Sequence, residues 1–187
     1  MSKFLKEMTD KELWQLFPVI ISEHKPYWKE YYLSEKKYLE KTIGKNNIFR
    51  INHIGSTSIP NLLSKPTIDI LIEIKDNADT QLLINRMEKG GYIYSPQPKK
   101  PAPHMMFMKG YTSQGFEDKV FHIHIRYTGE WDEIYFRNYL LSHPKAVKEY
   151  GELKLKLKEK FEYDRDAYTA GKTEFIKRIL NLVKSKK

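Results

Sequence analysis

The chain has 187 residues, and its hydrophobic content of 40% and aromatic content of 13% exclude a disordered chain and allow one sizeable core. It contains no cysteine, which excludes disulfides, thiolate catalysis and cysteine-ligated zinc, and it has no apolar run of signal-peptide or membrane-span length, so we expect a cytoplasmic protein without a membrane partner. The formal net charge is +9, and residues 145–187 carry 13 Lys and Arg against 7 Asp and Glu, which fits either a polyanionic partner or a solvated, Lys-rich helical face.

The first predicted elements are helices. Thr9 and Glu12 form a capping box for a short helix that ends before Pro18. A second helix is expected from Pro26, a favourable first-turn residue, to Gly44, which stops it.

Strands are predicted in the middle of the chain. Residues 48–54 form the first, and residues 66–74 are a near-continuous apolar run, typical of a strand covered on both faces. Residues 76–89 have helical composition, and a short strand over 92–94 follows a Gly-Gly pair.

The second half begins with an exposed, proline-rich loop over 95–104. Residues 105–109 and 119–126 are predicted to form an antiparallel hairpin, joined by the turn-rich segment between them. From residue 130 onward, apolar residues recur at helical spacing in three successive helices.

This order of elements predicts an α+β fold, because the strands cluster between helices instead of alternating with them. We expect a single domain over residues 1–187. Its N-terminal helices would occupy residues 1–46, the sheet core residues 47–128 and the C-terminal helices residues 129–187.

A polar turn follows the first strand. Gly55 permits close approach of the backbone, and the hydroxyls of Ser56, Thr57 and Ser58 can donate to phosphate oxygens. The next strand presents Asp69, a hard oxygen ligand suited to Mg²⁺. The alternatives are an ordinary polar turn and a buried carboxylate that caps a neighbouring loop.

The segment from His53 to Asp69, with Gly55, Ser56, Pro60, Lys65 and Pro66 between them, resembles the signature of the GrpB family, which belongs to the nucleotidyltransferase superfamily. Later segments resemble further blocks of the same family, in the same order: HIHI at 122–125, FRNYLLSHP at 136–144, EYGELK at 149–154 and YTAGKTEFI at 168–176.

The resemblance implies a nucleotidyltransferase-like small mixed sheet flanked by helices, with a C-terminal helical segment. Gly55 and Ser56 match the superfamily's phosphate-cradling turn, and Asp69 matches its first metal-binding carboxylate. Active members of the superfamily carry a second carboxylate two residues later, where this chain has Leu71. Glu73 shares the face of Asp69 but lies about 13 Å along the strand, so it does not replace that carboxylate.

His122 and His124 point to one face of their predicted strand. Together with Asp69 they would form a metal site that favours Zn²⁺, Mn²⁺ or Fe²⁺, whereas Asp69 alone favours Mg²⁺ or Mn²⁺. The alternative for the histidine pair is a polar, half-exposed strand face.

Lys172 lies in a Gly-Lys-Thr triplet, but Asp166 stands where a P-loop requires glycine, which excludes that motif. We instead expect a group of side chains to contact a triphosphate or another anionic substrate: Tyr168, Lys172, Lys65, Arg137 and Lys154. For Lys65, Arg137 and Lys154 taken singly, a solvated side chain or a helix contact is the alternative.

Three functions follow. The first is a metal-dependent nucleotidyltransferase with a nucleoside triphosphate donor and an unassigned small-molecule acceptor, in which Asp69 and Lys172 are catalytic. The second is a degenerate protein that binds a nucleotide or another anion without chemistry, as Leu71 suggests. The third, least favoured, is nucleic-acid binding by the basic C-terminal helices, with Tyr150, Tyr163 and Tyr168 stacking on bases.

Overall fold

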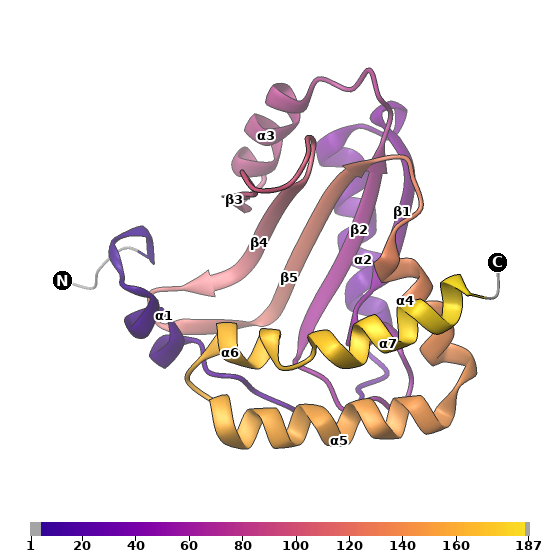
Figure 1. The fold of residues 1–187 in the computed structure, drawn as a ribbon. Helices are drawn as coiled ribbons and strands as arrows, with labels where there is room; N and C mark the ends of the chain where they lie inside the picture. Colours follow the sequence, from indigo (N-terminus) through magenta and orange to yellow (C-terminus); the bar gives the residue numbers. More distant parts are fainter. Residues whose placement is uncertain (1–4, 186–187) are drawn as a thin grey trace.

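The computed structural model describes residues 5–185 as a five-stranded mixed sheet flanked by helices (Figure 1). The strands run in the order β1-β2-β5-β4-β3, where β2 and β5 are parallel and the other neighbouring pairs are antiparallel. Their bounds are β1 Ile48–Ile54, β2 Thr67–Ile74, β3 Ile93–Pro96, β4 Met105–Thr112 and β5 Gly115–Tyr127. The predicted α+β class is confirmed.

The helices precede, interrupt and follow these strands. They are α1 Asp10–Leu16, α2 Trp28–Ile43, α3 Thr80–Lys89, α4 Asp132–Ser142, α5 Pro144–Phe161, α6 Arg165–Ala170 and α7 Thr173–Lys184, with 3-10 turns η1 Leu5–Glu7, η2 Lys45–Asn47 and η3 Ser56–Ser58. The predicted capping box is present, because Thr9 accepts from the backbone of Glu12 and the Glu12 carboxylate accepts from the backbone of Thr9. None of the helices within residues 5–185 combines the length and the hydropathy of a membrane span.

Three predictions were wrong in part. β3 continues to Pro96 and pairs with β4, so it includes the first two residues of the segment expected to be a loop. The part of the chain after residue 130 that the structure describes holds four helices, not three, because Asp164 caps the additional six-residue helix α6 by accepting from the backbone of Ala167. The β4–β5 hairpin also continues to residues 112 and 115, where a long loop was expected. A bulge after Lys109, with Gly110 at φ +87°, lets the strands continue through this polar sequence.

The two faces of β2 differ in composition. The isoleucines at alternate positions pack with α2, α3 and the neighbouring strands into the main core, with Ile70 and Ile72 fully buried. Asp69, Leu71 and Glu73 point to the opposite face, because side chains alternate along a strand. In Figure 1, α6 and α7 cross this sheet near the start of β2, with α5 beyond them. The face of β2 that carries Asp69 therefore meets the C-terminal helices.

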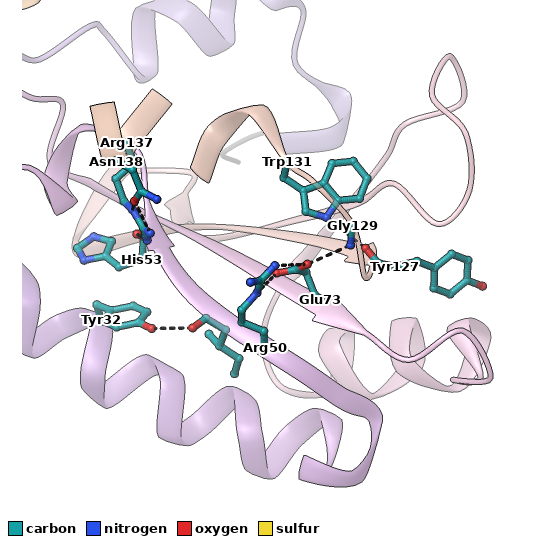
Figure 2. A network of polar contacts seen from close by, with 10 residues as sticks. Tyr32, Arg50, His53, Glu73, Tyr127, Gly129, Trp131, Arg137 and Asn138 are labelled. Atoms are coloured by element: carbon teal, nitrogen blue, oxygen red, sulfur yellow. Dashed lines mark hydrogen bonds and ion pairs between the residues drawn. The ribbon is translucent and has the colours of Figure 1, made fainter. Parts of the chain in front are cut away.

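Glu73 belongs to a separate network of polar contacts (Figure 2). Its carboxylate accepts from Arg50 Nη2 at 2.8 Å and from the backbone N–H of Gly129 at 3.2 Å. The Glu73 side chain is fully buried, whereas that of Arg50 is about half exposed. Arg50 of β1 thus neutralises the Glu73 carboxylate. Glu73 does not join Asp69, as expected from their separation of four residues along β2.

Replacing Arg50 with alanine is expected to lower the free energy of unfolding by about 2 kcal/mol, because the buried Glu73 carboxylate would keep only the Gly129 N–H. Urea unfolding at pH 7 measures this change. The double variant Arg50→Ala/Glu73→Leu is the control, and it should regain most of the loss because it buries no charge. A single variant as stable as the wild-type protein would contradict the prediction.

Candidate functional site

The predicted phosphate turn folds directly against Asp69. Ile54, the last residue of β1, pairs with Asp69 on β2, so that Gly55 passes over the carboxylate. Gly55 has φ +69° and ψ −176°, a conformation open almost only to glycine. A Cβ at this position would lie 2.2 Å from Asp69 Oδ2. The glycine therefore allows the turn and the carboxylate to occupy adjacent positions.

Two of the three predicted phosphate donors are used inside the turn itself. The Thr57 hydroxyl is buried and donates to the backbone carbonyl of Thr67 at 3.0 Å. Because that proton is committed, His53 Nε2 donates to Thr57 Oγ1 at 3.1 Å. Ser58 donates to the backbone carbonyl of Gly55 at 2.6 Å. Thr57 and Ser58 thus hold the shape of the turn.

Ser56 is the turn hydroxyl that lines the pocket. Lys154 of α5 donates to Ser56 Oγ at 3.0 Å, across 98 positions of sequence. Since an ammonium group has only donors, the serine oxygen accepts and its own proton remains able to point at a ligand. The Lys154 side chain also lies over the Tyr150 ring, 4.7 Å from its centroid.

A chain of polar contacts leads from α6 to Asp69. Arg165 Nη2 donates to Tyr111 Oη at 3.3 Å, and Tyr111 Oη lies 2.6 Å from His122 Nε2. Since arginine cannot accept, the tyrosine proton goes to His122 Nε2, and the ring keeps its own proton on Nδ1. That nitrogen lies 3.4 Å from Asp69 Oδ1. His122 is thereby oriented as a donor to the carboxylate.

The protonation states agree with this chain of contacts. Burial lowers the pKa of His122, which favours the neutral ring. Burial alone would raise the pKa of Asp69, but His122 and His124 hold it well below its usual range. Asp69 is therefore ionised at neutral pH.

A metal ion held by Asp69 and both histidines does not fit this arrangement. Both ring nitrogens of His122 face other groups, and His124 Nε2 lies 3.9 Å from Asp69 Oδ1. Within residues 5–185, no three His, Asp or Glu side chains are grouped so as to hold a metal ion. Leu71, at the position of the second carboxylate, is fully buried. Of the carboxylates that line the pocket within residues 5–185, Asp10 and Asp166 are exposed, whereas Asp69 is partly buried and lies beside His122.

These groups line one pocket with a volume of about 610 Å³. Four of its described lining residues are cationic: Lys65, Lys154, Arg165 and Lys172. Its other described lining residues include Ser56, Asp69, His122 and Tyr168 from the predicted set. The structure therefore brings most of the predicted site together.

The lysines of the pocket crowd one another. Burial, with the charges of Arg165 and Lys172, lowers the pKa of Lys65 to about 7. Burial and Lys172 lower the pKa of Lys154 to about 7, and burial lowers that of Lys172 to about 8 despite the opposing charge of Asp69. Burial is the main cause of these shifts, and a bound anion would oppose it by stabilising the charged form of the lysines.

Arg137 does not reach the pocket. Its guanidinium donates to the backbone carbonyl of His53 at 2.8 Å and to the Asn138 side chain at 2.8 Å (Figure 2). The His53 ring stacks on Tyr32 of α2, with 4.7 Å between ring centroids, and burial lowers its pKa to about 4. Arg137 and His53 thus support β1 and the turn from outside the site.

Comparisons with known proteins identify the family of this chain. Residues 18–182 match the family model described as GrpB protein. The chain belongs to the GrpB family. It is 32% identical over 166 residues to the Glutamate-rich protein GrpB of Alkalihalophilus pseudofirmus, which covers 87% of this chain and 94% of that relative.

Two further GrpB-family comparisons agree. The chain is 34% identical over 153 residues to UPF0157 protein YqkA of Bacillus subtilis, covering 80% of this chain and 43% of that relative's length. The crystal structure of conserved protein GrpB from Enterococcus faecalis superposes with a TM-score of 0.77 at 31% identity, covering 89% of this chain and 98% of that one. The family resemblance inferred from the sequence is confirmed.

Arg165, Trp14 and Tyr111 are pocket or network residues that sequence reasoning missed in this GrpB-family chain. Arg165 is the first residue of α6, which the periodicity did not separate from its neighbours. Trp14 belongs to α1, far from the GrpB signature in sequence. Asp164, an N-cap residue followed by a short helical run, was the available indication of α6.

The lysine cluster predicts an unusual dependence of stability on pH. A lysine whose folded-state pKa is about 7 or 8 releases its proton before the unfolded chain does, so the unfolded state binds more protons between about pH 7 and 10. The contribution of these lysines to the free energy of unfolding should therefore rise with pH over that range. Urea unfolding at pH 6.5 and 9, compared between wild type and Lys154→Met, measures it.

The Lys154→Met variant keeps the buried volume and removes one of the charges, so its pH slope should be shallower. Lys156→Met, at an exposed position of the same helix, is the control and should keep the wild-type slope. Equal slopes in all three proteins would contradict the prediction.

Proposed function

We propose that this protein binds a nucleoside triphosphate through its phosphates and transfers the nucleotidyl group to a small acceptor. The observation that carries the proposal is the convergence of Lys65, Lys154, Lys172 and Arg165 on a pocket whose turn presents Ser56. Cations with lowered pKa values and a free hydroxyl proton favour a ligand with several negative charges.

Asp69 is the protein oxygen donor for a Mg²⁺ ion that the phosphates carry. Mg²⁺ commonly keeps several waters and takes one or two carboxylates together with substrate phosphates, which suits Asp69, the partly buried carboxylate among those that line the pocket. When bound, the ion neutralises phosphate charge and helps to align the reacting groups. His122 keeps the Asp69 carboxylate oriented, because its Nδ1–H faces Oδ1.

The lysines would act where charge develops. Lys172, the residue before α7, lies over the Tyr168 ring, 4.5 Å from its centroid, which fixes the ammonium group at the pocket wall. A fixed cation beside a leaving phosphate stabilises the transition state without reorganisation of the site. Lys154 and Ser56, which contact each other, would supply a second group of donors to the triphosphate.

Binding without transfer is the second candidate, and the burial of Leu71 favours it. Leu71 occupies the position expected for a second carboxylate, and it is part of the sheet's packed interior. A protein with this arrangement can hold the nucleotide while providing only one carboxylate for the chemistry. Product analysis with candidate acceptors separates the two candidates, since both bind the nucleotide.

The basic C-terminal helices are poorly suited to stacking on nucleic-acid bases. Tyr150 and Tyr168, two of the three tyrosines considered for that role, are 5% and 1% exposed. Lys154 is turned inward on α5 as well. The buried tyrosines and lysine belong to the pocket and its supporting core, which favours a small anionic ligand.

The test is calorimetric titration with ATP, GTP, CTP, UTP and inorganic tripolyphosphate, each with and without Mg²⁺. We expect tripolyphosphate and at least one nucleotide to bind, and Lys154→Gln to weaken both by about tenfold because one charge-assisted contact is lost. Lys156→Gln, an exposed lysine on the same helix, is the matched control and should bind like wild type. A folded wild-type protein that binds none of these ligands would overturn the proposal.

A further inference from the structure

The tryptophan that lines the pocket has an unused ring. Trp28 is buried and contacts His24, and Trp131 lies under Arg126. Trp14 of α1 is half-buried and faces the pocket, yet among residues 5–185 its side chain makes no ring contact, cation–π contact or hydrogen bond. Indole rings usually bury their faces and find a partner for the N–H. Trp14 therefore offers a free aromatic surface to whatever fills the pocket.

The floor of the pocket changes in character across the sheet. Asp69 of β2 pairs in register with His122 of β5, which pairs in turn with Met108 of β4. Because neighbouring strands lie about 4.8 Å apart, the backbone of Met108 lies about 10 Å from that of Asp69 across the sheet. Met106 lies two residues along β4 on the same face, opposite Ser95 of β3. The floor thus passes from charged groups to thioethers.

The apolar end of the floor joins the packing of α1. Met108 and Leu13 both pack against the cluster of Phe17, Tyr111 and Val120. Leu13 and Trp14 are neighbours on α1, and both line the pocket. The part of the pocket lined by α1 and β4 is therefore largely apolar and aromatic, and its polar groups are the Ser95 hydroxyl and the exposed carboxylate of Asp10 on α1.

We propose that this end, formed by Trp14, Met106, Met108 and Ser95, receives the base of the bound nucleotide. The inference rests on the proposed function, since it requires phosphates at the lysines. A nucleoside triphosphate has the same division as the pocket, with a polyanion at one end and a flat aromatic ring at the other. Indole rings stack on every base, and methionine sulfur makes favourable contacts with aromatic rings.

The experiment compares each of ATP, GTP, CTP and UTP with inorganic tripolyphosphate, using calorimetry on wild type, Trp14→Leu and Trp14→Phe. Tripolyphosphate carries the full anionic group without a base, so it measures the cationic end alone. In wild type, at least one nucleotide should bind about tenfold more tightly than tripolyphosphate, in line with one stacked base. Trp14→Leu should lose that advantage, and Trp14→Phe should keep part of it. All three proteins should bind tripolyphosphate equally, which also shows that the variants are folded.

The inference is overturned if all four nucleotides bind wild type within about twofold of tripolyphosphate, or if the nucleotide advantage survives in Trp14→Leu. Either result is compatible with the proposed anion site but contradicts a base site at Trp14. A protein that binds neither tripolyphosphate nor nucleotides fails at the earlier step, the proposed function, and the base site falls with it.

Discussion

Replacing Gly55 with alanine is expected to lower the free energy of unfolding by about 3 kcal/mol and to weaken phosphate binding, because the turn that carries Ser56 would shift. Two causes add. The backbone of Gly55 has φ +69°, which strains an L-residue, and the new Cβ would lie 2.2 Å from Asp69 Oδ2 and 2.9 Å from Asp69 Cβ. The carboxylate would have to leave its place beside His122, which disturbs the pocket even where the chain still folds. Urea unfolding and calorimetry with tripolyphosphate measure the two effects.

Gly91→Ala is the matched control for this change. Gly91 has φ +84°, but a Cβ built there meets no atom within 4 Å. This variant carries the backbone strain without the collision, so it should cost about 1 kcal/mol and leave phosphate binding intact. The prediction is contradicted if Gly55→Ala is as stable as Gly91→Ala and binds tripolyphosphate as tightly.

Asp69→Asn is expected to reduce Mg²⁺-dependent nucleotide binding by about 100-fold or more and to abolish any nucleotidyl transfer. The amide keeps the size of the side chain but removes the charge that attracts the cation. Binding of tripolyphosphate without Mg²⁺ should persist, because Lys65, Lys154 and Lys172 remain. Titrations with and without Mg²⁺ separate these outcomes.

Asp166→Asn provides the comparison, since Asp166 lines the same pocket from α6 but is exposed. It should leave Mg²⁺-dependent binding nearly unchanged. The Asp69 variant should also be less stable at neutral pH. The lowered pKa of Asp69 stabilises the fold above the carboxyl's unfolded pKa, and this contribution disappears as the pH falls below it. Equal losses of Mg²⁺-dependent binding in both variants would contradict the assignment of Asp69.

The sequence predicted the strands and the position of Asp69 because these depend on local patterns. The apolar run of β2 and the glycine turn before it can be recognised from the residues of each segment alone. Lys154 and Lys172 were predicted because they lie in segments that resemble blocks of the GrpB family. The direction in which each hydroxyl of the turn points was not predictable. Thr57 faces the core because Thr67 O lies within reach, a contact that the spacing of residues does not reveal.

The remaining errors have a common cause in tertiary contacts. Arg137 was expected at the phosphates, but α4 directs it to the backbone of His53. Arg165 was missed because a helix of six residues produces too short a periodic pattern to detect. Trp14 reaches the pocket because α1 packs on the β4–β5 hairpin, an arrangement that depends on residues about 100 positions later.

The contact between Lys154 and Ser56 also has a kinetic consequence. It closes a loop of 98 residues, whereas β1 and β2 meet through a short connection. Contacts between distant residues form late in folding, because the entropy of a long loop is lost before the contact stabilises the chain. In a refolding experiment, sheet structure should therefore appear first, and the capacity to bind polyphosphate should appear only in the later phase in which α5 docks.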